Sequence, residues 1–168
     1  SNARIYLADP QGSALHAKVR HGVCYDTNQA EQRVRRHRYD TIADGIGLDR
    51  VTANFREARI DDAIRVSDAD ALVMAHYLLR FEGLFLGSSS ALNCVAALRA
   101  GAELRRGTDA PLTIVTVLCD GGARYLSRVW SREFVEARGL VWPPADGEAL
   151  AELAARLVAR EPGEGALL

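Results

Sequence analysis

The sequence is poor in several residue types, and each shortage argues against a class of protein. Its three cysteines, Cys24, Cys94 and Cys119, lie far apart and form no Cys-x-x-Cys motif. This spacing disfavours a disulfide framework and indicates reduced thiols inside a cell, either cytoplasmic or mitochondrial. No apolar run approaches the roughly 20 residues that span a bilayer, and a net charge of −1 argues against a nucleic-acid partner. We therefore expect neither a membrane nor a nucleic acid as partner.

Lysine is the rarest charged residue, since Lys18 is the only one among 21 basic residues. The four histidines form no pair at the helical spacing of metal ligands, so we expect no metal site. The 168 residues are 48% hydrophobic and 26% charged, which is ordinary for a globular protein that can bury a core. The Arg33–Arg38 run fits a solvated face of a short helix over 29–38 better than a phosphate-binding surface.

Strand and helix patterns alternate along the chain. The strand candidates are 4–8, 63–66, 84–86 and 112–118, and the longer helix candidates are 68–82, 91–105 and 148–160. Residues 112–118 are apolar on both faces, which is typical of a central parallel strand covered by helices. The alternation predicts an α/β fold with three layers, in which helices flank a mostly parallel sheet.

Three glycine-bearing segments lie at strand ends or in nearby loops: Gly45–Gly47, Gly87–Ser90 and Asp120–Gly122. Ligands of parallel sheets bind at the carboxyl ends of strands. At Gly87–Ser90 a strand meets a helix, and the free N–H groups and dipole of the helix favour an electron-rich ligand atom. From these residues alone, a plain serine cap fits this junction better than a ligand site does.

Four motifs together resemble a known family. They are Asp44-Gly45-Ile46-Gly47, Ile64-Arg65-Val66-Ser67-Asp68, the segment Glu82–Ala91 and the segment Leu118–Ser127. In this order and spacing they resemble the C-terminal part of the pyridoxal-phosphate-dependent cysteine synthases (O-acetylserine sulfhydrylase and cystathionine β-synthase, fold type II). Among these the cysteine synthase 2 branch is the most similar. The chain departs from the family pattern in having Asp44 for glutamate and Ala91 for glycine.

The resemblance implies a fold, a cofactor and a site. The fold would be a partial copy of the two-domain fold type II enzyme, with 1–3 an expression-tag remnant, 4–142 the C-terminal part of the catalytic domain and 143–168 a C-terminal helix and tail. The cofactor would be pyridoxal 5′-phosphate. Ser89 matches the serine that hydrogen-bonds the pyridine nitrogen, and Gly45 matches a glycine whose backbone approaches cofactor and substrate. Asp120 would lie near the same pocket, although a loop-capping aspartate explains it equally well.

The resemblance also implies what stands outside this chain. The family's Schiff-base lysine and phosphate-binding loop belong to N-terminal motifs that have no counterpart here, and Lys18 stands in a different motif context. No catalytic residue is therefore expected in this chain. We expect a C-terminal fragment that is inactive alone, completes its site with the missing N-terminal half, and derives from a homodimeric parent that takes an amino-acid substrate.

The implied reaction of the parent is β-replacement, in which O-acetylserine or a related serine derivative exchanges its leaving group for sulfide and forms L-cysteine. A neutral serine hydroxyl leaves the pyridine ring largely uncharged, a mild electron sink that suits loss of a β-substituent. A related cystathionine β-synthase, dehydratase or cysteine desulfhydrase stays open. So does a truncated, non-catalytic binding or assembly module.

Overall fold

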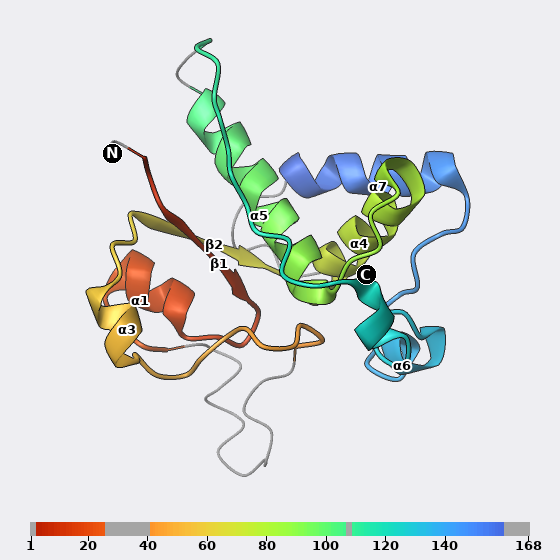
Figure 1. Ribbon diagram of the computed structural model, residues 1–168, viewed down its shortest axis with the longest axis horizontal. Helices are drawn as coiled ribbons and strands as arrows, with labels where there is room; N and C mark the ends of the chain where they lie inside the picture. The colour runs from red at the N-terminus through yellow and green to blue at the C-terminus, as the bar shows by residue number, and fades with distance from the viewer. Residues whose placement is uncertain (1–2, 26–40, 107–108, 160–168) are drawn as a thin grey trace.

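The computed structural model describes residues 3–25, 41–106 and 109–159. The helix expected over 29–38 and the Arg33–Arg38 run lie outside these residues. The elements in chain order are β1 (Tyr6–Pro10), α1 (Leu15–His21), α3 (Ala53–Glu57), β2 (Asp62–Val66), α4 (Asp68–Glu82), α5 (Ser88–Arg105), the 3₁₀ helix η1 (Gly122–Tyr125), α6 (Arg132–Glu136) and α7 (Gly147–Ala159) (Figure 1).

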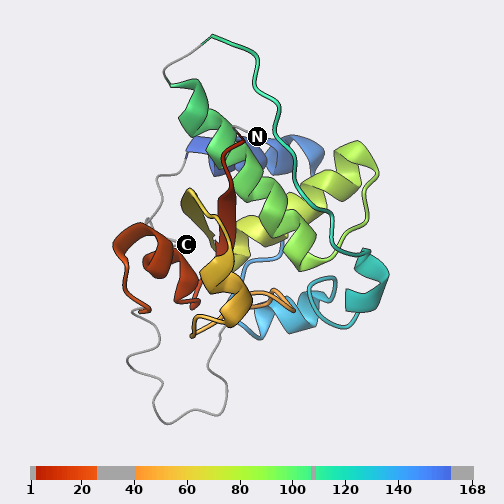
Figure 2. The same ribbon diagram turned by 60° about the vertical axis from the view of Figure 1, so that its left-hand side comes forward.

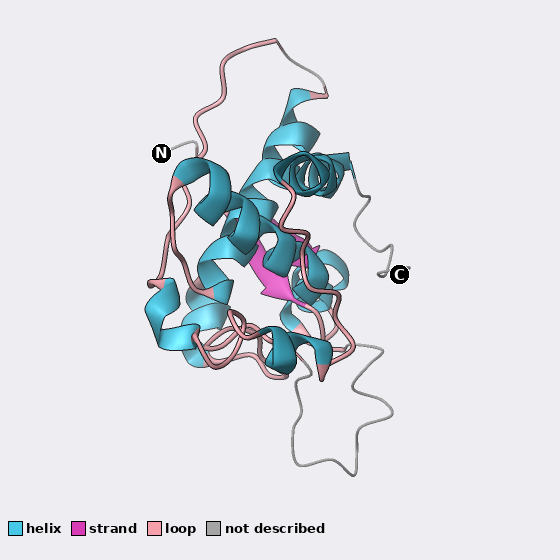
Figure 3. Ribbon diagram, turned by 90° about the vertical axis from the view of Figure 1, so that its right-hand side faces the viewer, coloured by secondary structure: helices cyan, strands magenta, loops and turns pink. Residues whose placement is uncertain are grey.

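The two strands pair in parallel, in a register that runs from Tyr6 opposite Asp62 to Pro10 opposite Val66. Helix α1 packs on the sheet from one side and α5 from the other (Figure 2). Helices α4 and α7 then pack against α5 and against each other. The pair of strands therefore lies inside a largely helical shell (Figure 3). The expected α/β class, with a parallel sheet flanked by helices, is confirmed.

Helix α4 begins and ends where the local sequence predicts. The Ser67 hydroxyl accepts a hydrogen bond from the amide of Asp70 and so caps the first turn. Gly83 ends the helix with a φ of 69°, a conformation that glycine adopts without the steric cost of a side chain. On this helix Leu72 and Ala75 are buried, whereas Leu79 is exposed.

The segment 112–118 differs from its prediction as a central strand. It is extended along α5 (Figure 1) but pairs with neither β1 nor β2, and Val115 is 87% exposed. The predicted strand 84–86 is reduced to one antiparallel bridge between Leu86 and Gly121. The physical reason is that an apolar strand is buried only when neighbouring strands and covering helices are present, and the described residues supply α5 on one side alone.

Helices α1 and α3 arise in stretches where no helix is expected from sequence. Helix α1 ends at Gly22, whose φ of 76° is left-handed. Helix α3 is capped by the Thr52 hydroxyl, which accepts from the amide of Phe55. Both helices are short, so their apolar periodicity is too brief to be distinctive.

Arg99 joins four elements in the core. Its side chain is 8% exposed, and its Nη2 lies 2.8 Å from the Asp70 carboxylate at the start of α4. Its Nε donates to the carbonyl of Leu157 in α7 at 2.9 Å, and its Nη1 donates to the carbonyl of Arg65 in β2 at 3.1 Å. A buried guanidinium with three acceptors has its charge well compensated, so Arg99 locks α5 against its neighbours.

Candidate functional site

The three serines that follow Gly87 lie in the first turn of α5, one turn earlier than the predicted start of that helix. Two of them bind the protein itself. Ser88 donates its hydroxyl to the carbonyl of Ile42 at 3.4 Å, and the Ser90 hydroxyl accepts from the amide of Cys119 at 2.9 Å. Ser89 is 5% exposed, and within the described parts of the chain its hydroxyl has no hydrogen-bond partner. Ser89 is therefore the one of these three serines whose hydroxyl is unbonded within the described residues.

The Asp120 turn closes on the start of α5. The Asp120 carbonyl accepts from the amide of Gly87 at 3.0 Å, and Ser90 donates to the same carbonyl at 3.3 Å. A Cβ on residue 87 would collide with the Asp120 carboxylate and would stand 2.6 Å from the Tyr125 ring. Position 87 therefore favours glycine, because the Asp120 and Tyr125 side chains leave no room for a Cβ.

The Asp120 side chain is half-buried and has one bonded oxygen. Tyr125 donates its hydroxyl to Oδ2 at 2.6 Å, whereas Oδ1 is buried and has no partner among the described residues. This hydrogen bond is the main cause that raises the pKa of Tyr125 above its usual value. Asp120 thus takes part in a specific side-chain pair, and Tyr125 was not predicted as its partner.

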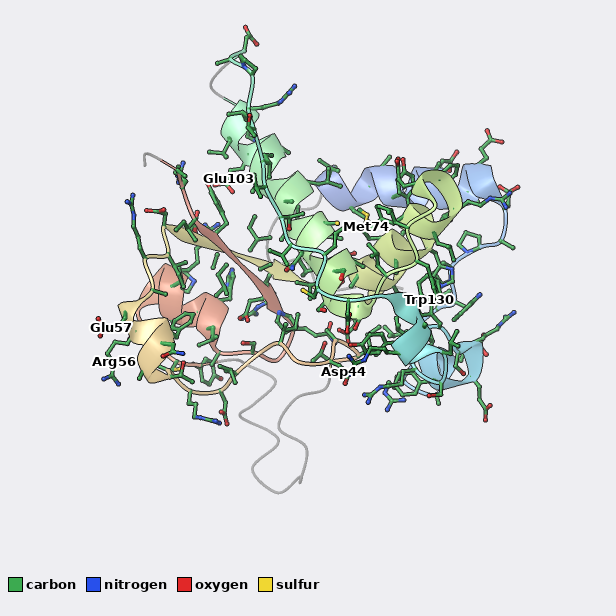
Figure 4. The ribbon with its side chains drawn as sticks, in the orientation of Figure 1. Asp44, Arg56, Glu57, Met74, Glu103 and Trp130 are labelled. Atoms are coloured by element: carbon green, nitrogen blue, oxygen red, sulfur yellow. The ribbon has the colours of Figure 1, made fainter. Side chains whose placement is uncertain are left out.

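The loop that carries Gly45 is fixed from a distant part of the chain. Gly45 has a φ of 78°, and a Cβ built on it would meet nothing within 4 Å. Its neighbour Asp44 forms an ion pair with Arg128 at 3.0 Å. Figure 4 shows Asp44 on the side of the molecule where η1 and α6 lie. A side chain at position 45 would therefore meet no neighbour, and it is the left-handed backbone that favours glycine there.

The structure brings the three predicted site residues into one neighbourhood through the turn of α5 that contains Ser89. Ser88 contacts the loop just before Gly45, and Ser90 contacts Asp120. Sequence reasoning overlooked Asp68, which anchors that loop through Thr41 and Ile42. Asp68 ends the Ile64–Asp68 motif, but that motif alone predicted no role for its side chain.

The residues present fit the ring nitrogen of pyridoxal phosphate. The Ser89 hydroxyl can donate one hydrogen bond to a neutral acceptor, and the N-terminus of α5 disfavours added positive charge nearby. Lys18 lies on α1, where its ammonium group donates to the carbonyl of Gly22 at 2.8 Å. Within the described residues no group of His, Cys, Asp and Glu could hold a metal ion.

His76 is half-buried and lies between two indole rings. Its ring centroid is 4.8 Å from that of Trp130 and 4.6 Å from that of Trp142. Burial lowers the pKa of His76 to about 4, so its imidazole is neutral near neutral pH. Its Nε2 is buried and has no hydrogen-bond partner among the described residues.

Several curated relatives are named cysteine synthases. The chain is 50% identical over 133 residues to cysteine synthase 2 of Emericella nidulans, covering 78% of this chain and 30% of that protein. It is 47% identical over 139 residues to cysteine synthase 2 of Schizosaccharomyces pombe, covering 82% of this chain and 34% of that protein. The chain therefore spans about one third of the length of these relatives.

A solved structure and a family model agree with these relatives. The O-acetylserine-dependent cystathionine β-synthase of Helicobacter pylori superposes with a TM-score of 0.53 at 27% identity, over 74% of this chain and 33% of that chain. No helix among the described residues is long and apolar enough to cross a membrane. Residues 1–120 match the family model described as pyridoxal-phosphate dependent enzyme. The chain belongs to the pyridoxal-phosphate-dependent enzyme family.

Proposed function

We propose that this chain is the C-terminal part of a cysteine synthase, in which Ser89 binds the pyridine nitrogen of pyridoxal phosphate. The observation that carries the proposal is Ser89, which is 5% exposed at the start of an 18-residue helix and whose hydroxyl has no partner in the described parts of the chain. The hydroxyl oxygen is not among the fully buried atoms without a partner, so a ligand can reach it. A polar group in so buried a residue normally has a hydrogen-bond partner. A bound ring nitrogen supplies that partner.

The reaction of the whole protein is β-replacement on O-acetylserine or a related serine derivative, with sulfide as the nucleophile and L-cysteine as the product. The cofactor supplies an electron sink for the carbon skeleton of the substrate. The Ser89 hydroxyl donates to the ring nitrogen without transferring a full proton, since a serine hydroxyl is a weak acid. The open side of Gly45 leaves room for the cofactor and substrate. The hydrogen-bonded Asp120–Tyr125 pair packs against Gly87, next to the first turn of α5.

The proposal also covers what this chain does alone. Its only lysine, Lys18, lies in α1 and binds the carbonyl of Gly22, so no lysine of the chain is assigned to the cofactor aldehyde. Without such an amine the covalent link to the cofactor cannot form. The chain alone is therefore inactive in cysteine formation. Activity requires the N-terminal part of the longer protein, which acts as a homodimer in the cytoplasm or in mitochondria.

The Ser89 role is tested on the chain as it stands. Pyridoxine 5′-phosphate carries the same ring and phosphate but no aldehyde, so it cannot react with Lys18. Titration followed by amide NMR should shift the signals of the first turn of α5 and of Gly45. The Ser89→Ala variant should lose the α5 shifts, whereas Ser131→Ala, which removes the cap of another helix, should keep them. Shifts unchanged in Ser89→Ala would refute the assignment.

The reaction is tested on the intact natural gene product. Its mass should exceed that of this chain, and it should form cysteine from O-acetylserine and sulfide. In that protein Ser89→Ala should slow release of acetate while leaving substrate affinity almost unchanged, because the hydroxyl contacts the cofactor rather than the substrate. An intact product of this length, or an unchanged rate in the variant, would contradict this part of the proposal.

A second candidate function is an assembly module, and the exposed segment 112–118 favours it. Val115 and Val117 are 87% and 65% exposed, and the segment pairs with neither strand of the sheet. A free apolar edge readily accepts another strand, here the same segment of a second copy. Light scattering should then show a dimer that Val115→Lys converts to a monomer. If the unsubstituted chain is a monomer, this candidate function is eliminated.

A further inference from the structure

The loop that carries Gly45 is held at its start by a buried carboxylate to which the proposed chemistry gives no task. Asp68 is 2% exposed. Its Oδ1 accepts a hydrogen bond from the Thr41 hydroxyl at 2.5 Å, and its Oδ2 accepts one from the amide of Ile42 at 2.8 Å. Both donors stand just before Gly45 in the chain. Asp68 therefore connects the start of α4 to the base of the glycine loop.

The same loop is bound from the serine side. Ile42 presents its amide to Asp68, while its carbonyl accepts the Ser88 hydroxyl at 3.4 Å. The Ile42 side chain is buried with Leu72 and Val129. One residue is thus held through its amide, its carbonyl and its side chain. Because Ser88 immediately precedes Ser89, the peptide of Ile42 physically links the glycine loop to the first turn of α5.

Gln11 adds a third support to the carboxylate. Its Nε2 donates to Oδ2 of Asp68 at 3.2 Å, and its Oε1 accepts the Asp68 amide at 3.2 Å. Hydrogen bonds to a charged acceptor are shorter and stronger than neutral ones, and the N-terminus of α4 favours a negative charge at this position. An aspartate at 68 can satisfy amide, hydroxyl and side-chain donors together, whereas an asparagine offers one acceptor oxygen.

We propose that Asp68 is a positioning residue, whose carboxylate sets the placement of the Gly45 loop relative to Ser89. This inference rests on the proposed function, because that function names the cofactor that Gly45 and Ser89 would contact. The placement itself is a property of the chain without ligand, so it can be measured separately. A general structural role of Asp68 would loosen the whole fold, whereas a positioning role loosens the glycine loop first.

Asp70 provides the matched control. It stands in the same first turn of α4 and is also buried, at 4% exposed. Its carboxylate pairs with Arg99 of α5 at 2.8 Å, and that arginine leads to β2 and α7. Asp68→Asn and Asp70→Asn therefore remove the same charge from the same helical turn, but the bonds that they weaken lead to different parts of the molecule.

The experiment is amide hydrogen exchange on the unliganded chain. Asp68→Asn should speed exchange of the amides 42–47 about tenfold or more relative to the α5 core, since a hydrogen bond to a charged group contributes at least that factor. Asp70→Asn should speed exchange in α4 and α5 without this selective effect. Unchanged loop exchange in Asp68→Asn, or an equal selective rise in Asp70→Asn, would overturn the proposal. If Asp68→Asn does not fold, Thr41→Val removes one of the two loop contacts of Asp68, together with the hydrogen bond from the Ala43 amide to the Thr41 hydroxyl, and should also give a selective rise.

A second measurement separates this inference from the proposed function. Asp68→Asn should weaken binding of pyridoxine 5′-phosphate several-fold, while Asp70→Asn should leave the affinity near that of the unsubstituted chain. If the unsubstituted chain does not bind this compound, the proposed function fails. The exchange experiment then still decides whether Asp68 positions the loop, because it requires no ligand.

Discussion

Tyr125 donates its hydroxyl to Oδ2 of Asp120 at 2.6 Å, across the turn that closes on the first turn of α5. The pair joins η1 to the end of the extended segment, next to Gly87. Since the other carboxylate oxygen has no partner among the described residues, the phenol is the main constraint on the orientation of this side chain.

The Asp120–Tyr125 pair predicts a change in phenol titration. The hydrogen bond to the carboxylate is the largest cause that raises the pKa of Tyr125, because loss of the phenolic proton would place two negative charges together. In Asp120→Asn the pKa of Tyr125 should fall towards its ordinary value of about 10. Alkaline titration by ultraviolet absorbance measures it, with Tyr125→Phe identifying the signal. If the pKa of Tyr125 does not fall in this variant, Asp120 is not the cause of the raised pKa.

Two glycines of equal backbone conformation allow a matched test of the loop. Gly45 and Gly22 have φ values of 78° and 76°, and a Cβ on either meets nothing within 4 Å. Alanine at either position should lower the free energy of unfolding by about 1–2 kcal/mol, the cost of left-handed backbone. Denaturant titration measures this cost. Only Gly45→Ala should also weaken binding of pyridoxine 5′-phosphate, and equal weakening in Gly22→Ala would contradict a local role of Gly45.

The buried ion pair of Arg99 and Asp70 predicts a large loss of stability. Arg99→Met leaves the Asp70 carboxylate buried without its guanidinium, which should lower the free energy of unfolding by about 3–5 kcal/mol. The double variant with Asp70→Asn should lose less than the sum of the two single losses, because the stranded charge is gone. Urea unfolding of the four proteins measures this coupling. Additive losses would show that the two side chains contribute independently.

His76 predicts a pH dependence of stability. Burial lowers its pKa to about 4 in the folded chain, whereas in the unfolded chain the pKa is about 6.5. The unfolded state therefore binds the extra proton first, and the stabilising contribution, complete above pH 6.5, is lost as the pH falls towards 4. In His76→Phe this loss should be absent, since the phenyl ring keeps the contacts with both indoles. A stability difference between parent and variant that is constant over this range would contradict the assignment.

Much of the fold was predictable because its signals are local. A serine cap and a left-handed glycine bound α4 within its own sequence, and β2 follows from a short apolar run. The first turn of α5 was placed late, since serines are typical caps and here they lie inside the helix. The segment 112–118 could not be placed from its own pattern, because burial of a strand depends on neighbours contributed by other parts of a protein.

The candidate site was only partly predictable for the same reason. Ser89 was found through a motif, and the structure adds that its hydroxyl has no partner in the described residues. Asp68 and Thr41 are 27 positions apart, and Asp44 meets Arg128 from the other end of the chain. Such pairs arise from the packing of whole elements and leave no periodic trace in a single sequence.

The exposed segment along α5 has a consequence for handling the protein. Residues 112–118 contain no charge and no proline, and five of the seven are β-branched on a chain that is otherwise rich in arginine and acids. Sulfate and phosphate salts strengthen apolar association, and stretches of this composition seed cross-β fibrils. Concentrated stocks in such salts should gel or turn turbid sooner than dilute stocks in chloride, and a lysine in place of Val115 should keep them clear.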